Sequence, residues 1–172
     1  MKLLYVLFLL AGCSAFAQNI EALSWKEARL NNRLDLTVTK KEYEKLYRVP
    51  DSLMAPEDGE TCTKGDVKML YHKGAKFELV NDVLSFRSID FTKNSHTFLS
   101  FKYDWFDHTT TLKSFRKTYP AASEFMEDFI AADGDVYDMI SLLPKDTPDN
   151  YEWLFYFNNG KLVMIECLFV CE

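Results

Sequence analysis

The residues best suited to acid–base chemistry lie close together in the second half of the chain. Asp104, Asp107 and His108 are near neighbours, and hydroxyl groups follow at Thr109–Thr111. A histidine held by a carboxylate can activate a hydroxyl nucleophile, provided that each group orients the next within hydrogen-bonding distance. An envelope hydrolase using Asp104, Asp107 and His108 is therefore one hypothesis. The alternative is that these residues form a turn and cap a helix.

Metal and cofactor motifs are missing from the sequence. His72, His96 and His108 have no metal-ligand spacing, and no histidine accompanies the cysteines. There is no glycine-rich phosphate loop, no GxSxG and no HExxH. The sequence therefore predicts neither a cofactor nor a metal site.

The N-terminal segment has the layout of a bacterial secretory signal. Lys2 precedes the apolar run Leu3–Leu10, and Ala15 and Ala17 supply the small residues of a cleavage site. The run is shorter than the roughly 20 apolar residues that span a bilayer. These features predict removal of residues 1–17 and localisation in the periplasm or outside the cell.

A lipid attachment site is an alternative reading of the same segment. Leu10–Cys13 (LAGC) fits the motif that is cut before a lipidated cysteine. Lipidation of Cys13 would give an outer-membrane lipoprotein, and it is the only route by which we expect contact with a membrane.

Three cysteines follow the predicted signal, at Cys62, Cys167 and Cys171. An oxidising compartment favours one disulfide. Cys167 and Cys171 are four residues apart in a predicted strand and thus separated by about 13 Å, beyond the Cα separation of about 7 Å that a disulfide tolerates. Cys62 lies in a polar loop and can pair with either. We favour Cys62–Cys171, with Cys167 as a buried thiol.

Composition narrows the class of protein. Removal of 17 of the 172 residues leaves 155, about one domain. A hydrophobic content of 48% and an aromatic content of 15% are sufficient for a packed core. The net charge is −6, or −7 without Lys2. Because phosphate binding needs clustered Lys and Arg, this charge argues against nucleic acid as a partner.

Residue periodicity predicts alternating helices and strands. Helices are expected at Ser24–Leu30, Thr39–Tyr47, Thr111–Tyr119 and Ala121–Ala132, and a short helix or strand at Tyr137–Leu143. Strands are expected at Arg33–Val38, Asp66–His72, Lys76–Val80, Val83–Phe91, Thr97–Phe106, Tyr151–Phe157 and Lys161–Cys171. Turns are expected at Lys73–Gly74, Asn81–Asp82 and Asn158–Gly160. In Thr97–Phe106, the apolar face comprises Leu99, Phe101, Tyr103 and Trp105.

Two parts of the chain share one pattern. Thr39-x3-Tyr43-x-Lys45-x-Tyr47 aligns with the segment from Thr111 to Tyr119 at an offset of 72 residues, and a proline follows each helix. The predicted fold is α+β, an antiparallel sheet with helices packed on one face and a tandem repeat of strand–helix–meander units. The predicted domain is residues 33–172, with repeats at 33–92 and 97–172, after a linker and short helix at 18–32.

This layout resembles the β-lactamase-inhibitor-protein fold, and one unit of it resembles the small SmpA/OmlA outer-membrane lipoproteins. Leu36–Leu46 (LTVTKKEYEKL) and Tyr151–Leu162 (YEWLFYFNNGKL) carry the resemblance. The glycines that flank the helix in that pattern are absent here. The resemblance implies a binding protein whose sheet face carries exposed aromatic residues.

The leading functional hypothesis is a non-enzymatic binding protein of a bacterial envelope, acting on another protein as an inhibitor, immunity factor or assembly partner. Lys102, Asp104, Tyr156 and Glu166 are the predicted contact residues, because they project from the sheet opposite the presumed core face. A lipid-anchored structural protein is a third hypothesis.

Overall fold

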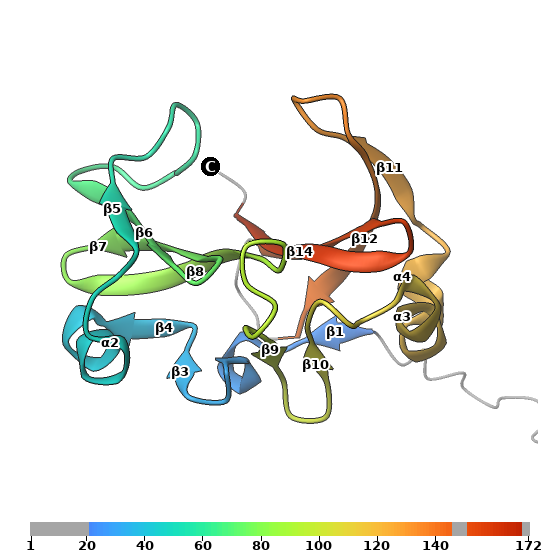
Figure 1. Ribbon diagram of the computed structural model, residues 1–172, viewed down its shortest axis with the longest axis horizontal. Coiled ribbons are helices and arrows are strands. Elements are labelled where there is room, and N and C mark those ends of the chain that lie inside the picture. The colour runs from blue at the N-terminus through green and yellow to red at the C-terminus, as the bar shows by residue number, and fades with distance from the viewer. Residues whose placement is uncertain (1–20, 146–150, 170–172) are drawn as a thin grey trace, which may run out of the picture.

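The computed structural model describes residues 21–145 and 151–169 (Figure 1). The chain is α+β with largely antiparallel sheets, as predicted. The predicted signal, the lipidation candidate Cys13 and the disulfide candidate Cys171 lie outside the described residues.

The larger sheet has ten strands in the order β1-β12-β13-β14-β8-β7-β6-β5, with β11 beside β12 and β4 beside β8. Its strands are β1 (Ala22–Leu23), β4 (Thr37–Thr39), β5 (Ser52–Met54), β6 (Val67–His72), β7 (Ala75–Val80), β8 (Val83–Asp90), β11 (Glu127–Ile130), β12 (Val136–Pro144), β13 (Tyr151–Asn158) and β14 (Lys161–Phe169). Every pair is antiparallel except β1·β12. The two meanders β5–β8 and β11–β14 meet where β14 pairs with β8.

The smaller sheet has four strands in the order β10-β9-β2-β3. They are β2 (Arg29–Leu30), β3 (Leu34–Asp35), β9 (Leu99–Ser100) and β10 (Trp105–Phe106). The hydrophobic core lies between the two sheets. Phe106, for example, places its ring 4.9 Å from that of Phe155 on β13, and both residues are buried.

Three hairpin turns were correctly predicted from local residue types. Lys73 and Gly74 connect β6 to β7 with φ of 48° and 83°. Asn81 and Asp82 connect β7 to β8 with φ of 48° and 63°, and Asn159 and Gly160 connect β13 to β14 with φ of 49° and 72°. Positive φ at both central residues matches the right-handed twist of the flanking strands. These turns fix the register of the strands that they join.

The helices α2 (Lys40–Tyr47) and α3 (Leu112–Thr118) begin at the predicted capping residues. Thr39 and Thr111 each accept a hydrogen bond from the backbone N–H three residues later, and the side chain at that later position reciprocates. Each helix buries one aromatic ring, Tyr43 or Phe115. The short η1 (Trp25–Glu27) and α4 (Pro120–Ser123) complete the helical elements of the described residues.

The prediction of a helix at Ala121–Ala132 was wrong. Helix α4 ends at Ser123, and Glu127–Ile130 form strand β11. The apolar residues of this segment have helical spacing, but pairing with β12 overrides the local pattern. The segment Tyr137–Leu143, left open between helix and strand, belongs to β12.

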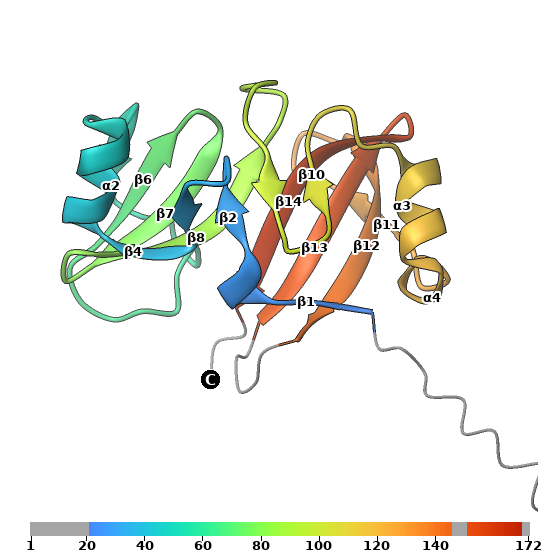
Figure 2. The ribbon, with the colours of Figure 1, turned by 90° about the horizontal axis from the view of Figure 1, so that it is seen from below.

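The N-terminal part of the described chain packs into the core, and its predicted helix at Ser24–Leu30 is limited to η1, because Arg29–Leu30 form strand β2. Leu23, Ala28 and Leu30 are buried, and Trp25 packs against the rings of four aromatic residues of the larger sheet. The predicted strand Arg33–Val38 is also divided, because β3 belongs to the smaller sheet and β4 to the larger one. Figure 2 shows the N-terminal part of the described chain, from β1 through β2 to β4, running across both sheets.

Candidate functional site

The segment from Leu99 to Phe106 is a tight hairpin and not the single strand predicted. Ser100 pairs with Trp105 and Leu99 pairs with Phe106, while the Phe101 N–H donates to the Asp104 carbonyl at 2.6 Å. The fold-back buries Leu99 and Phe106 together in the core. We refer to residues 101–105 as the hairpin tip.

The hairpin tip exposes two large aromatic side chains. Tyr103 is 83% exposed and Trp105 is 68% exposed, although the alternating pattern predicted both on the core face. The Lys102 ammonium lies 5.1 Å from the centre of the Tyr103 ring, and its interaction with Tyr103 raises the pKa of Lys102. A hollow of about 430 Å³ lies at the tip, lined in part by Asn32, Phe98 and the tip residues themselves.

Asp104 is held in place from outside the hairpin. The Tyr119 hydroxyl, at the end of α3, donates to Asp104 Oδ2 at 2.9 Å. Burial and the adjacent Asp104 carboxylate raise the pKa of Tyr119 well above its usual value, so the hydroxyl stays protonated as a donor. This bond connects the hairpin tip to the core, where Tyr119 packs on Phe106 and Phe115.

Replacing Tyr119 with phenylalanine is expected to lower the free energy of unfolding by about 1–2 kcal/mol, because the variant loses one hydrogen bond to a charged group. Urea denaturation measures the difference. Tyr103→Phe is the matched control, since its exposed hydroxyl should contribute less than about 0.5 kcal/mol. Equal stabilities of Tyr119→Phe and the unmodified protein would show that the bond does not hold the tip.

The predicted acid–base cluster is not assembled. Asp107 Oδ1 accepts hydrogen bonds from the backbone N–H of Thr109 at 2.7 Å and from its hydroxyl at 2.6 Å. His108 is exposed, and within the described residues no hydrogen bond joins Asp104, Asp107 and His108 to one another. The geometry is that of an Asx turn preceding α3.

The other two predicted contact residues lie elsewhere, on the face of the larger sheet opposite Phe155. Tyr156 is only 2% exposed, because the rings of Phe129 and Tyr137 cover it, and its hydroxyl donates to Glu166 Oε2 at 2.9 Å. Burial and the Glu166 carboxylate raise the pKa of Tyr156. Tyr156 therefore does not project to solvent as the alternating pattern predicted, and Lys102 and Asp104 do not share its surface.

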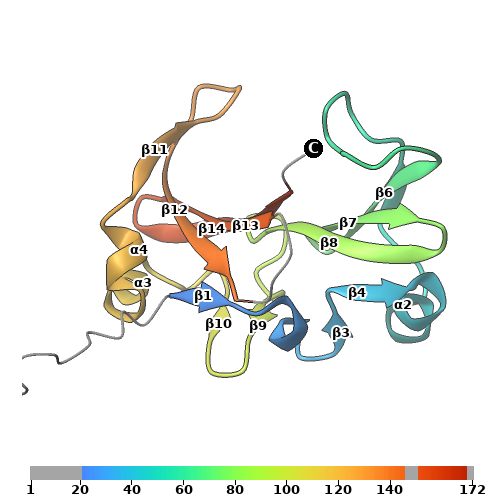
Figure 3. The same ribbon diagram turned by 180° about the vertical axis from the view of Figure 1, so that it is seen from behind.

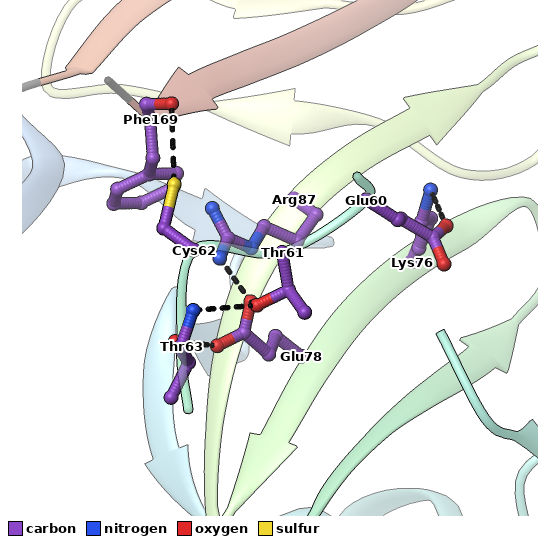
Figure 4. A network of polar contacts seen from close by, with 8 residues as sticks. All are labelled: Glu60, Thr61, Cys62, Thr63, Lys76, Glu78, Arg87 and Phe169. Atoms are coloured by element: carbon purple, nitrogen blue, oxygen red, sulfur yellow. Dashed lines mark hydrogen bonds and ion pairs between the residues drawn. The ribbon is translucent and has the colours of Figure 1, made fainter. Parts of the chain in front are cut away.

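A buried carboxylate that the sequence did not single out lies on β7 (Figure 4). Glu78 is 4% exposed, forms an ion pair with Arg87, and accepts hydrogen bonds from the hydroxyls of Thr61 and Thr63. The ion pair Lys76–Glu60 lies beside it. A glutamate within an alternating strand is normally solvent-exposed, so nothing in the local pattern indicated this network. It fixes residues 60–63 against the larger sheet.

Cys62 is placed next to the end of β14. Its Sγ lies 3.8 Å from the carbonyl oxygen of Phe169, two residues before Cys171 in sequence. Cys167 is buried on β14, as expected. The pairing Cys62–Cys171 stays a prediction, because Cys171 is outside the described part of the chain.

Three further findings concern metal-ligand clusters, membrane-spanning helices and similarity to known proteins. In residues 21–145 and 151–169, no group of three or more His, Cys, Asp or Glu is arranged to hold a metal ion. No helix within the same residues is long and apolar enough to cross a bilayer. The chain matches no protein-family model, and comparisons with curated proteins and with solved structures found no match either.

Proposed function

We propose that the chain is an exported, non-enzymatic binding protein of a bacterial envelope, which contacts another protein through the hairpin tip. The exposed pair Tyr103 and Trp105 carries this proposal. Burial would stabilise both side chains, yet the fold presents them to solvent on a short turn held by Asp104 and Tyr119. Inhibitor, immunity factor and envelope assembly partner are the roles that such a surface fits.

The chemistry of the tip suits protein recognition. Tyr and Trp are enriched among the residues that contribute most to binding energy, because they bury a large area at little cost in side-chain entropy. Lys102 adds a charge beside them, and the adjacent hollow offers space for a partner side chain. Since the Tyr119–Asp104 bond fixes the turn, little ordering should be required on binding.

The proposal includes a duplicated architecture with both helices on one face of the larger sheet. Helix α2 precedes the meander β5–β8 and helix α3 precedes the meander β11–β14. Tyr43 and Phe115 occupy equivalent helix positions, and both are buried. The capping residues also correspond, because Thr39 pairs with Val83 at the start of β8 and Thr111 forms a bridge to Lys161 at the start of β14. These correspondences support an ancestral repeat. If Cys13 carried a lipid, the same binding protein would be anchored to the outer membrane.

The double substitution Tyr103→Ala/Trp105→Ala is expected to weaken binding to the envelope partner by about 100-fold or more, since each anchor contributes about 2 kcal/mol or more. The measurement is affinity capture from envelope extract with the mature protein as bait, followed by titration of the captured protein. The unfolding midpoint should change little, because both side chains are exposed.

The matched control truncates two exposed apolar residues that lie far from the tip in sequence, Leu46→Ala/Val49→Ala. This variant should retain the partner. Binding that is equally strong with both double variants would contradict the proposed contact surface. An enzymatic activity lost in Asp107→Ala/His108→Ala without loss of folding would contradict the non-enzymatic class.

A further inference from the structure

Strand β11 forms a free edge of the larger sheet. Among residues 21–145 and 151–169, its one pairing partner is β12, through four residue pairs from Glu127↔Met139 to Ile130↔Val136. All four β11 residues are exposed. Figure 3 shows β11 as the outermost strand at its end of the sheet. An unpaired edge presents backbone N–H and C=O groups that can pair with another strand.

Apolar side chains lie along this edge. Ile130 and Val136 are cross-strand partners, and they are 69% and 55% exposed. Phe129 projects from the other face of β11 and is 37% exposed. A strand added beside β11 would cover apolar surface on both faces as well as completing backbone hydrogen bonds.

The hairpin formed by β11 and β12 is strongly acidic. Residues 124–138 contain six carboxylates and no Lys, Arg or His; the six are Glu124, Glu127, Asp128, Asp133, Asp135 and Asp138. Within the described residues, none of the six is neutralised by an ion pair. The nearby cation Arg116 contacts the sulfur of Met126.

We infer that β11 is a docking edge for an extended, cationic segment of another protein, which adds to the sheet as a further strand. Basic residues of that segment would lie beside Glu127 and Asp128, and its apolar residues beside Phe129 and Ile130. This surface is distinct from the hairpin tip, and the inference does not depend on it. Strand addition of this kind gains affinity from main-chain hydrogen bonds and specificity from alternate side chains.

The six carboxylates of this hairpin disfavour the pairing of β11 with a second copy of this chain. An edge-to-edge dimer would bring two sets of six carboxylates together, in a chain whose net charge is already −6. Charged side chains on an edge strand are a common protection against self-association. Here they are all of one sign, so they repel like surfaces and attract basic ones.

The test uses a fluorescent six-residue peptide, Lys-Lys-Val-Val-Lys-Lys, titrated into the purified protein and followed by anisotropy. Its adjacent lysines point to opposite faces of an added strand, as Glu127 and Asp128 do, and so do its two valines. A second peptide has the same sequence with N-methyl groups on alternate backbone nitrogens, which keep its charge but block strand pairing. We expect the N-methylated peptide to bind at least about tenfold more weakly. Hydrogen exchange of β11 amides should slow by about tenfold or more with the unmodified peptide.

Reversing the charge of β11 provides a second test of the inference. Glu127→Lys/Asp128→Lys should weaken peptide binding by at least about tenfold, whereas the control Glu57→Lys/Asp58→Lys, with the same change in net charge, should alter it by less than about threefold. The inference would be overturned if the two variants lost peptide binding equally, or if the two peptides bound equally well. It would also be overturned if the unmodified peptide did not bind, or if the exchange of β11 amides did not change. A dimer that Glu127→Lys/Asp128→Lys dissociates would instead identify a second copy as the occupant and would also overturn it.

Discussion

Replacing Glu78 with alanine is expected to lower the free energy of unfolding by about 3–5 kcal/mol. The substitution leaves the half-buried Arg87 without its counter-ion and removes the acceptor for the Thr61 and Thr63 hydroxyls. Breaking a buried ion pair by removing one partner costs about this much, because the remaining charge stays desolvated. Urea denaturation of the two proteins measures the difference.

The matched control is Asp66→Ala. Asp66 also pairs with a cation, Lys68, but its side chain is largely exposed. Surface pairs of this kind contribute at most about 1 kcal/mol. Comparable losses in the two variants would mean that the Glu78 network does not stabilise the fold in the way that its burial implies.

The same carboxylate should make stability depend on pH. Burial opposes ionisation of Glu78, but hydrogen bonds from Thr63, Arg87 and Thr61 outweigh it and hold the pKa below the ordinary 4.5. A carboxyl group with a lowered pKa in the folded state stabilises the protein above the unfolded value. That contribution is lost as the pH falls from about 4.5 through the lower folded-state pKa. Glu78→Gln should therefore lose less stability over this interval than the unmodified protein does.

The second large effect concerns the predicted disulfide. A Cys62–Cys171 bond would close a loop of about 110 residues, since 171 − 62 is 109. In the chain-entropy description, a loop of this size stabilises the folded state by about 4–5 kcal/mol. Cys62→Ser should therefore lower the free energy of unfolding by about that amount under oxidising conditions. Under reducing conditions the two proteins should differ by much less.

Peptide mapping identifies the pairing independently of stability. A non-reduced digest of the protein purified under oxidising conditions should contain one peptide pair joined through Cys62 and Cys171. The position of Cys62 beside the Phe169 carbonyl favours this partner. Cys167→Ala should leave the pair intact. A digest in which Cys62 is joined to Cys167, or in which all three thiols are reduced, would contradict the prediction.

Features encoded in a few adjacent residues were predictable from the sequence. Thr39 and Thr111 cap helices because a hydroxyl three residues before an available N–H satisfies an otherwise unpaired donor. Asn81–Asp82 and Asn159–Gly160 form turns because these residues tolerate positive φ. In each case the determining interaction lies within the segment itself, so no knowledge of the tertiary fold is needed.

Features decided by distant partners were not predictable. The segment after Ser123 has helical spacing but pairs with β12 instead. The conformation of the hairpin tip was not predictable for the same reason. Alternation placed Tyr103 and Trp105 in the core, whereas burial of Leu99 beside Phe106 requires the chain to fold back between them. Periodicity alone does not show where a strand reverses, and this reversal is what exposes the two aromatic rings.

The most direct test of the central claim is site-specific photo-crosslinking in living cells. Tyr103 is replaced by p-benzoylphenylalanine, and Val49, which is also exposed and lies far from the tip in sequence, provides the control position. If the hairpin tip is the contact surface, irradiation should join position 103 to one discrete envelope protein and should give no such product at position 49. Absence of an adduct at position 103, or identical adducts at both positions, would contradict the account.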